Sequence, residues 1–343
     1  MDTTENGYFT FIIKTKFFFN SVFGSFEFSA GDGLYSILAV LLIYWSVRGI
    51  IRRIKKEQDK PNNYPIKILI TLNILYLWFM VSFGLLYNYR NFPQYGAKEE
   101  KVFLNEYKTV AGNLLNDCRA LREEVTVNRA GEFSVNRENM IKKLYLEQSV
   151  FYGIPQQKPN LKKSWFSSVM KKIGIFGYYN PFTGEAQVAE GFPDVSLPFT
   201  LAHEMGHQVG VAREDEANFY SFYMGESSAD KDFQYSVKYK ALNYLLREIY
   251  VNDSTFVKRV LDNYSEGMKK DREKEKKYYE QMSGFGSDAF SYMNHAYLKS
   301  NDQEEGIVAY NNVSKMIVNF YKKNHPSLFK KEEYFNYPKK EKK

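Results

Sequence analysis

The residues whose types and spacing point most directly to chemistry are His203, Glu204 and His207, in the stretch His-Glu-Met-Gly-His. On a helix, positions i and i+4 lie one turn apart on the same face. Two imidazoles placed in this way can bind one Zn²⁺ at about 2.0–2.1 Å each. The intervening glutamate is offset around the helix, where it can act on a water molecule without being a ligand. A chance occurrence of the pattern on an ordinary helix is the simpler alternative.

A third ligand is needed, because catalytic zinc usually takes three protein ligands and leaves a fourth position open. Glu214 and Glu216 are the candidates, both a short distance after His207. We expect Glu214, because Asn218 follows it one helical turn later and is placed to hydrogen bond to a ligand histidine. Glu216 remains the alternative. Both carboxylates would also be favourable simply as negative charges at the start of a helix.

This set of residues predicts hydrolysis of a peptide bond. Zn²⁺ would polarise the scissile carbonyl and lower the pKa of a water molecule. Glu204 would take the proton of that water as general base and pass it to the leaving amine. The tetrahedral oxyanion needs a further donor, and the candidates are Tyr178, Tyr179, Arg213 and His295.

Two alternatives to an enzyme remain. One is a non-catalytic zinc-binding protein, in which the metal only joins two helices. The other is a membrane scaffold or envelope-assembly protein whose metal site is vestigial. Structural zinc prefers four closed protein ligands, commonly cysteines. The chain has one cysteine, Cys118, and it retains Glu204, so both features favour catalysis.

The elements that must position these residues follow from the flanking pattern. Pro198 suits the first turn of the metal-binding helix and Gly210 can end it. The segment from Gly174 to Gly191 alternates glycine, aromatic and β-branched residues, which predicts a short hairpin or irregular strand pair. Its part from Tyr178 to Ala186 is either an edge strand that pairs with an extended substrate or a structural support for the helix.

Helical patterns dominate the rest of the soluble region. Residues 99–125 and 134–152 have the periodicity of amphipathic helices, and helical patterns resume from residue 198 to residue 323. The charged stretch 269–277 is typical of a solvated helix face. We therefore predict a mainly α protein with a small β element, in which residues 97–330 form a zincin-like metallopeptidase domain and residues 331–343 form a Lys-rich tail.

Two hydrophobic segments precede this domain, and we assign residues 34–90 to two transmembrane helices joined by a basic loop. Ile68–Tyr89 contains no charged residue and is long enough to cross a hydrocarbon core of roughly 30 Å. Gly33–Val47 is shorter and reaches that length if Arg48 snorkels. Within residues 1–33, the apolar segment 8–24 carries two lysines, which favours an interfacial helix over a span. It lacks the small-residue cleavage site of a removable signal peptide.

The charge of the loop between the two spans predicts the topology. Lysine and arginine concentrate in short loops on the cytoplasmic side, and this loop carries Arg48, Arg52, Arg53, Lys55, Lys56, Lys60 and Lys67. Two crossings then place both termini and the catalytic domain outside the cytoplasm, in a multi-pass protein of a bacterial inner membrane. If the first segment does not cross, the large domain lies inside instead.

Composition excludes some other classes. Of 343 residues, 44% are hydrophobic, which permits a real core. The net charge of +7 is concentrated in the loop and the tail, and no aromatic-basic motif for nucleic acid is present. The expected partners are therefore a peptide or protein substrate and the lipid bilayer, with no nucleic acid.

The two-helix arrangement resembles the gluzincin metalloproteases, whose third ligand is a glutamate in a Glu-x-x-x-Asp/Asn pattern. Glu214 and Asn218 match that pattern, although the segment between His207 and Glu214 is shorter than in most of the group. The sequence is also similar to the extended metzincin motif as far as Gly210. There the third-ligand position falls on Arg213, which cannot bind a metal, and this departure counts against a metzincin.

The order of segments along nearly the whole chain resembles one domain-of-unknown-function family of bacterial membrane proteins that are predicted zinc peptidases. The resemblance implies a membrane-anchored zinc metallopeptidase. The matching stretches are residues 28–35 (Phe-Ser-Ala-Gly-Asp-Gly-Leu-Tyr), 87–90 (Tyr-Asn-Tyr-Arg), 177–186 (Gly-Tyr-Tyr-Asn-Pro-Phe-Thr-Gly-Glu-Ala), 197–200 (Leu-Pro-Phe-Thr), 203–219, 297–299 (Tyr-Leu-Lys) and 306–310 (Gly-Ile-Val-Ala-Tyr).

Overall fold

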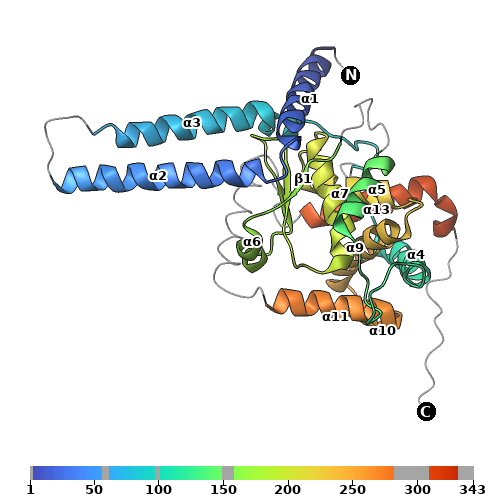
Figure 1. Ribbon diagram of the computed structural model, residues 1–343. Helices are drawn as coiled ribbons and strands as arrows, with labels where there is room; N and C mark the ends of the chain where they lie inside the picture. Colours follow the sequence, from blue (N-terminus) through green and yellow to red (C-terminus); the bar gives the residue numbers. More distant parts are fainter. Residues whose placement is uncertain (1–2, 56–61, 97–100, 149–157, 282–308, 331–343) are drawn as a thin grey trace.

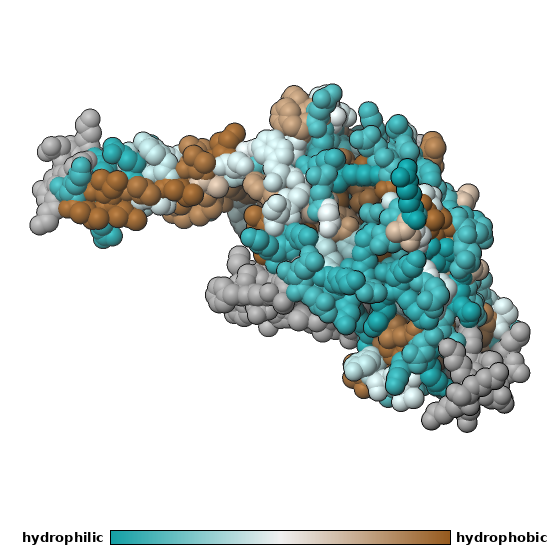
Figure 2. Space-filling view, turned by 60° about the horizontal axis from the view of Figure 1, so that its bottom comes forward, coloured by the Kyte–Doolittle hydropathy of each residue, from teal (hydrophilic) through white to brown (hydrophobic). Residues whose placement is uncertain are grey.

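Two long helices project as a hairpin from a helical domain in the computed structural model (Figure 1). The structure describes residues 3–55, 62–96, 101–148, 158–281 and 309–330. The hairpin consists of α2 (Ala30–Ile54) and α3 (Tyr64–Ser82). Both helices are long and apolar enough to cross a membrane, and only 6% of the most apolar part of each is buried. Figure 2 shows the hairpin as an apolar arm beside a largely hydrophilic domain.

The second apolar helix overlaps the predicted span Ile68–Tyr89 but begins and ends earlier in the chain. It ends at Ser82, and the chain continues into the short 3₁₀ helix η1 (Gly84–Asn88). Leu86 and Tyr87 of η1 are buried against the domain. Hydropathy does not distinguish a side chain that faces lipid from one that is buried in protein, so the pattern extended the span too far.

Helix α1 (Thr3–Gly24) crosses the base of the hairpin and contacts α3 (Figure 1). Ile12, Lys16 and Asn20 form a stripe at helical spacing that is buried against neighbouring elements. Phe11 and Phe18 are exposed. The segment that the sequence predicts to be interfacial is therefore a helix that packs through one face and leaves aromatic rings on another.

The domain core is formed by helices that the periodicity largely anticipates. Long helices α4 (Leu104–Arg122) and α9 (Lys231–Tyr250) pack together, with α7 (Leu197–Gln208), α8 (Glu214–Gly225) and α13 (Ala309–Asn324) around them. The predicted helices at 99–125 and 134–152 are present over shorter ranges as α4 and as α5 (Arg137–Glu147). Residues 99–100 and 149–152 of these predictions lie outside the described part of the chain. The remaining described helices are α6 (Ser167–Ile173), η2 (Asp194–Ser196), α10 (Ser254–Asp262), α11 (Glu266–Glu280) and η4 (Pro326–Phe329).

A small sheet lies beside α7 and contains the predicted hairpin. Strand β2 (Gly177–Tyr179) pairs antiparallel with β3 (Ala186–Val188), with Tyr178 opposite Gln187. A third strand, β1 (Leu161–Lys163), pairs parallel with β3 and was not predicted. The order β1-β3-β2 places β2 at an edge of the sheet. Three-residue strands are too short for a reliable alternation signal, which explains why β1 was missed.

The root of α2 is joined to this sheet by buried carboxylates. The backbone N–H of Gly31, in the first turn of α2, donates to Glu185, where a negative charge is favourable. Asp32 accepts hydrogen bonds from the backbone of Trp165, at 2.7 Å, and from the hydroxyl of Tyr178. Glu185 and Asp32 are both fully buried. The apolar hairpin is therefore attached to the strands beside α7 through several polar contacts.

Candidate metal centre

Helix α7 places the two histidines of the motif side by side. Pro198 lies in its first turn, and nearly all of the helix is buried in the core. The Nε2 atoms of His203 and His207 are 3.1 Å apart, and their rings are almost perpendicular. The helical spacing seen in the sequence therefore produces two imidazoles whose Nε2 atoms point toward the same place.

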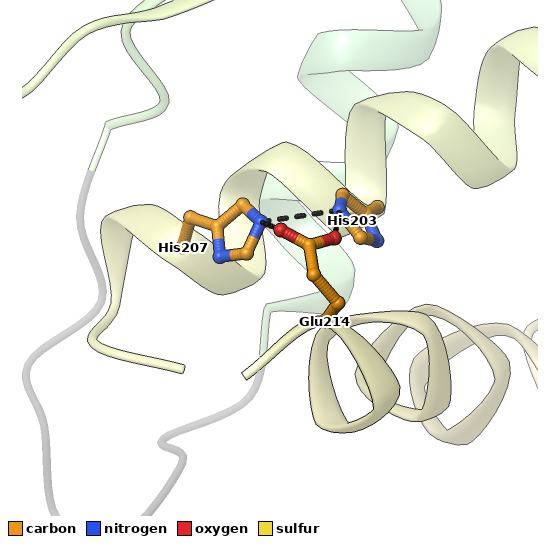
Figure 3. A group of neighbouring side chains, drawn as sticks. All are labelled: His203, His207 and Glu214. Carbon is orange, nitrogen blue, oxygen red and sulfur yellow. Dashed lines mark hydrogen bonds and ion pairs between the residues drawn. The ribbon is translucent and has the colours of Figure 1, made fainter. Parts of the chain in front are cut away.

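The turn after α7 returns the chain to these rings. Gly210 has φ = 101°, a left-handed conformation that side chains other than glycine rarely adopt. Its N–H donates to the carbonyl of His207 at 3.2 Å. Helix α8 then begins at Glu214, whose Oε2 lies 3.3 Å from His203 Nε2 and whose Oε1 lies 3.5 Å from His207 Nε2. Figure 3 shows the carboxylate lying between the two rings.

The three donors have the separations that one tetrahedral zinc ion requires. Ligands at about 2.0–2.1 Å from a tetrahedral ion lie about 3.3 Å from one another. The two Nε2 atoms are 3.1 Å apart, and each lies 3.3 or 3.5 Å from a different oxygen of the Glu214 carboxylate, so the separations are of this size. His203, His207 and Glu214 are also the group of potential metal donors found within the described residues. Three converging donors leave one tetrahedral position open, which is the arrangement of a catalytic site.

Glu216, the alternative ligand, lies elsewhere. Its Oε2 accepts from the backbone N–H of Asn91 at 3.0 Å and from the side-chain amide of Asn91 at 2.9 Å. Burial raises the pKa of Glu216, against the opposing effect of these hydrogen bonds. Glu216 therefore attaches the segment after η1 to α8, while Glu214 faces the histidines.

The orientation of His207 is set by a backbone carbonyl and not by Asn218. Nδ1 of His207 lies 2.7 Å from the carbonyl oxygen of Val211, which leaves the lone pair on Nε2 when Nδ1 carries the proton. The expected bond from Asn218 to a ligand histidine is absent from the described contacts, since its Oδ1 accepts from the hydroxyl of Tyr244 at 3.1 Å. Spacing along a helix does not determine which of several neighbours an amide meets.

Glu204 is buried beside the edge strand. Its Oε2 has no hydrogen-bond partner among the described residues. A Cβ added at Gly177 of β2 would lie 2.5 Å from Oε1, so only glycine leaves room for this carboxyl. Burial, against the opposing effect of His203, raises the pKa of Glu204 to about 8. Such a carboxyl is suited to accept and return a proton near neutral pH.

The carboxylate of Glu214 has the opposite electrostatic environment. Desolvation disfavours its charged form, but the adjacent imidazoles of His207 and His203 outweigh this and hold its pKa well below the ordinary value. A carboxylate that stays ionised is the form that binds a metal. The pKa values of the two glutamates of the site are thus shifted in opposite directions.

The candidate donors to the oxyanion lie in different places relative to the histidines. Tyr178 donates its hydroxyl to Asp32 at the root of α2, and Arg213 lies 3.4 Å from Asp215. The ring of Tyr179 is next to that of His207, with 6.3 Å between centroids. His295 lies outside the described residues. Of these candidates within the described part of the chain, only Tyr179 has a ring contact with a histidine of the site.

Lys16 is a residue near the site that sequence reasoning missed. It is buried at 3% exposure, and its Nζ donates to the carbonyl of His207 at 2.6 Å. The ammonium also lies over the rings of Tyr179, at 4.4 Å, and Phe83, at 4.8 Å. Burial lowers the pKa of Lys16 well below its ordinary value, and in its charged form the side chain complements the helix dipole at the C-terminal end of α7. The signal in the sequence that could have pointed to Lys16 was its position within an apolar segment, although that segment is far from His207 in the sequence.

The comparisons with known proteins identify the family to which the chain belongs. Residues 6–318 match the family described as protein of unknown function (DUF3810). The protein belongs to that family, and the match covers the apolar hairpin, the sheet and the helices of the metal centre. No match was found among curated proteins or among solved structures.

Proposed function

We propose that this protein is a membrane-anchored zinc metallopeptidase. The observation that carries the proposal is the convergence of His203, His207 and Glu214 at tetrahedral separations, with a buried glutamate on the same helix. When bound there, zinc would supply a Lewis acid for the peptide carbonyl and lower the pKa of a water. The hairpin would cross a bacterial inner membrane twice, with the domain on the extracytoplasmic side.

The residues of the chain have distinct parts in this reaction. His203, His207 and Glu214 would hold the metal, and the carbonyl of Val211 orients His207. Glu204 would accept the proton of the attacking water and then protonate the leaving amine. Strand β2 packs against α7 and has no strand on its outer side within the described sheet, so an extended peptide could add there as a further strand.

Substitution of Glu204 tests this proposal. Glu204→Gln keeps the size of the side chain but removes the general base, so we expect peptide hydrolysis to fall at least about 100-fold while zinc content stays at one ion per chain. Purified full-length protein would be assayed by metal analysis and by mass spectrometry of a peptide library. Undiminished cleavage with metal bound would rule out this role for Glu204.

A metal scaffold makes a different prediction for the same pair of measurements. A vestigial site would contain no zinc in the unmutated protein, and a purely structural site would contain zinc in a closed coordination sphere and cleave nothing. His203→Ala is the control for both measurements, since it removes a donor from the group. Oε2 of Glu204 has no hydrogen-bond partner among the described residues. This favours the peptidase, because a structural zinc site does not need a buried, unpaired carboxyl beside the metal.

A further inference from the structure

The end of the apolar hairpin touches a residue of the metal centre. Helix α3 ends at Ser82, and the ring of Phe83 lies 5.9 Å, centroid to centroid, from that of His207. Phe83 shares a buried cluster with Ile12 of α1 and with Ala212, which precedes Glu214 by two positions. The exit of the hairpin and the ligands are therefore separated by single side chains.

Further contacts hold the end of the hairpin at a fixed distance from the candidate metal ligands. Asn91, just after η1, donates two hydrogen bonds to Glu216 in the first turn of α8. At the other arm, Glu185 and Asp32 join the start of α2 to the sheet beside α7. Because both arms are attached through buried polar contacts, the metal centre keeps a set position relative to the end of the hairpin.

The length of α3 determines where that position lies in a bilayer. Nineteen residues at 1.5 Å per residue span about 28 Å, which is close to the roughly 30 Å of a hydrocarbon core. If α3 crosses the bilayer, no spare length remains, so Ser82 lies at the lipid–water boundary. Phe83 and the histidine that it contacts then lie at the level of the lipid headgroups.

A row of aromatic rings continues from the hairpin across the domain. Ring contacts link Trp78 of α3 to Phe19 of α1, and then continue through further rings to Trp165 before α6. Phe18, Phe28 and Trp165 are 63%, 54% and 56% exposed. We call this row the aromatic belt, and its members are Phe18, Phe19, Phe23, Phe26, Phe28, Trp78 and Trp165.

We propose that the aromatic belt lies in the headgroup region of the bilayer and that the metal centre therefore works at the lipid–water boundary. Its substrates are the membrane-proximal segments of polypeptides tethered to the same bilayer. The substrate class rests on the proposed peptidase function, whereas the position of the belt does not. Belts of tryptophan and other aromatics settle at this level of membranes, and this belt is continuous with a helix that is apolar enough to span.

The position of the belt can be measured without any enzymatic activity. Trp45→Phe and Trp78→Phe together leave Trp165 as the only tryptophan. The full-length protein would be reconstituted in vesicles of phosphatidylethanolamine and phosphatidylglycerol that contain nitroxide-labelled lipids. We expect Trp165 fluorescence to be quenched most by a nitroxide near the headgroup and less by one deep in the acyl chains.

A matched control uses an exposed aromatic on another part of the domain. Tyr250 is 62% exposed and precedes α10, which lies across the domain from the hairpin in Figure 1. A variant with Tyr250→Trp and all three native tryptophans replaced by Phe should show no lipid quenching. Equal quenching of both reporters, or none of Trp165, would overturn the proposal. The latter result with a dimer in solution would assign the belt to a second copy of the chain.

The substrate class needs a comparison of two formats of the same randomised peptides. One format is free in solution, and the other extends from a transmembrane anchor through polar spacers of about 5 to about 60 residues. Because an extended residue spans about 3.3 Å, we expect cleavage within about 10 residues of the bilayer and at least about tenfold faster than for free peptides. Equal rates, or cleavage spread along the whole extension, would contradict the substrate class.

The two experiments also separate this inference from the peptidase proposal. Glu204→Gln protein in the same vesicles reports the background of cleavage by contaminants. If neither format is cleaved above that background, the peptidase proposal and its substrate class both fail. Quenching of Trp165 would still decide whether the metal centre lies at the boundary.

Discussion

His207 shows how much one side chain of the centre depends on residues distant in the sequence. Its Nε2 faces His203 and Glu214, and its Nδ1 contacts the carbonyl of Val211. Its own backbone carbonyl accepts from Lys16. A ring held in this way needs little rearrangement to bind a metal, because its tautomer and direction are already set.

The choice between the two candidate glutamates can be tested by metal affinity. Glu214→Gln removes a charged donor from the group, so we expect zinc affinity to fall about 100-fold or more, beyond the usual effect of a supporting residue. Glu216→Gln changes a side chain that bonds to Asn91, so affinity should change less than about tenfold. Competition titration with a zinc chelator measures both.

The reverse order of these effects would assign the third ligand to Glu216. A global loss of structure is excluded by recording circular dichroism of both variants, because helix content should stay the same.

At the scale of elements, the edge strand and the metal helix are fitted to each other at Gly177. The carboxyl of Glu204 occupies the space that a side chain would fill at that position. The edge strand therefore limits where the carboxyl of Glu204 can lie, while the outer edge of this strand stays unpaired within the described sheet.

Gly177→Ala should consequently impair catalysis without removing the metal. A Cβ at 2.5 Å from Oε1 of Glu204 forces that carboxyl to move, and a displacement of about 1 Å can cost about 100-fold in rate. We expect kcat to fall by that order while zinc content is unchanged. Gly33→Ala is the control, because its Cβ would meet Trp165 at an ordinary 3.6 Å. An unaffected kcat in Gly177→Ala would show that Glu204 has free space.

The attachment of α2 to the sheet should contribute measurably to stability. Asp32→Ala removes the acceptor for the backbone N–H of Trp165 and the hydroxyl of Tyr178. Leaving these donors unsatisfied should cost about 2–4 kcal/mol, which lowers Tm in detergent by several degrees. The exposed Glu27, just before α2, gives the control Glu27→Ala, which should leave Tm unchanged. Equal Tm values for the two variants would contradict a structural role for Asp32.

At the scale of the molecule, two apolar helices and a polar domain are joined into one body. Arg52 and Arg53 lie in the last turn of α2, at the end of the hairpin away from the domain (Figure 1). Their charge predicts that this end faces the cytoplasm. The domain would then lie on the other side of the membrane.

Cysteine labelling in intact cells tests that topology. Cys118→Ala removes the only cysteine, which is buried. In that background we expect a membrane-impermeant maleimide to label Glu124→Cys, on the exposed surface of the domain, before lysis. Lys55→Cys, at the end of α2, should be labelled only after lysis. The opposite pattern would place the domain in the cytoplasm.

Local patterns were enough for several features of this protein. The spacing of His203 and His207, Pro198 and Gly210 predicted α7 and its end, because helix periodicity and turn geometry depend on near neighbours. The apolar runs predicted two long helices, and glycines with aromatics predicted the β2–β3 hairpin. The choice of Glu214 over Glu216 rested on a hydrogen bond expected from Asn218 to a ligand histidine, and that bond is absent from the described contacts.

Contacts between distant segments could be decided only by the tertiary structure. The burial of Lys16 under His207, the bond between Asn91 and Glu216, and the link between Asp32 and Tyr178 all join residues far apart in sequence. The position at which the second apolar helix ends, Ser82, could also be decided only by the structure. The hydropathy of Leu86 and Tyr87 is the same whether these side chains face lipid or are buried in a protein core. The sequence by itself therefore determined the residues able to hold a metal, and the packing of distant elements determined that they lie at the root of the hairpin.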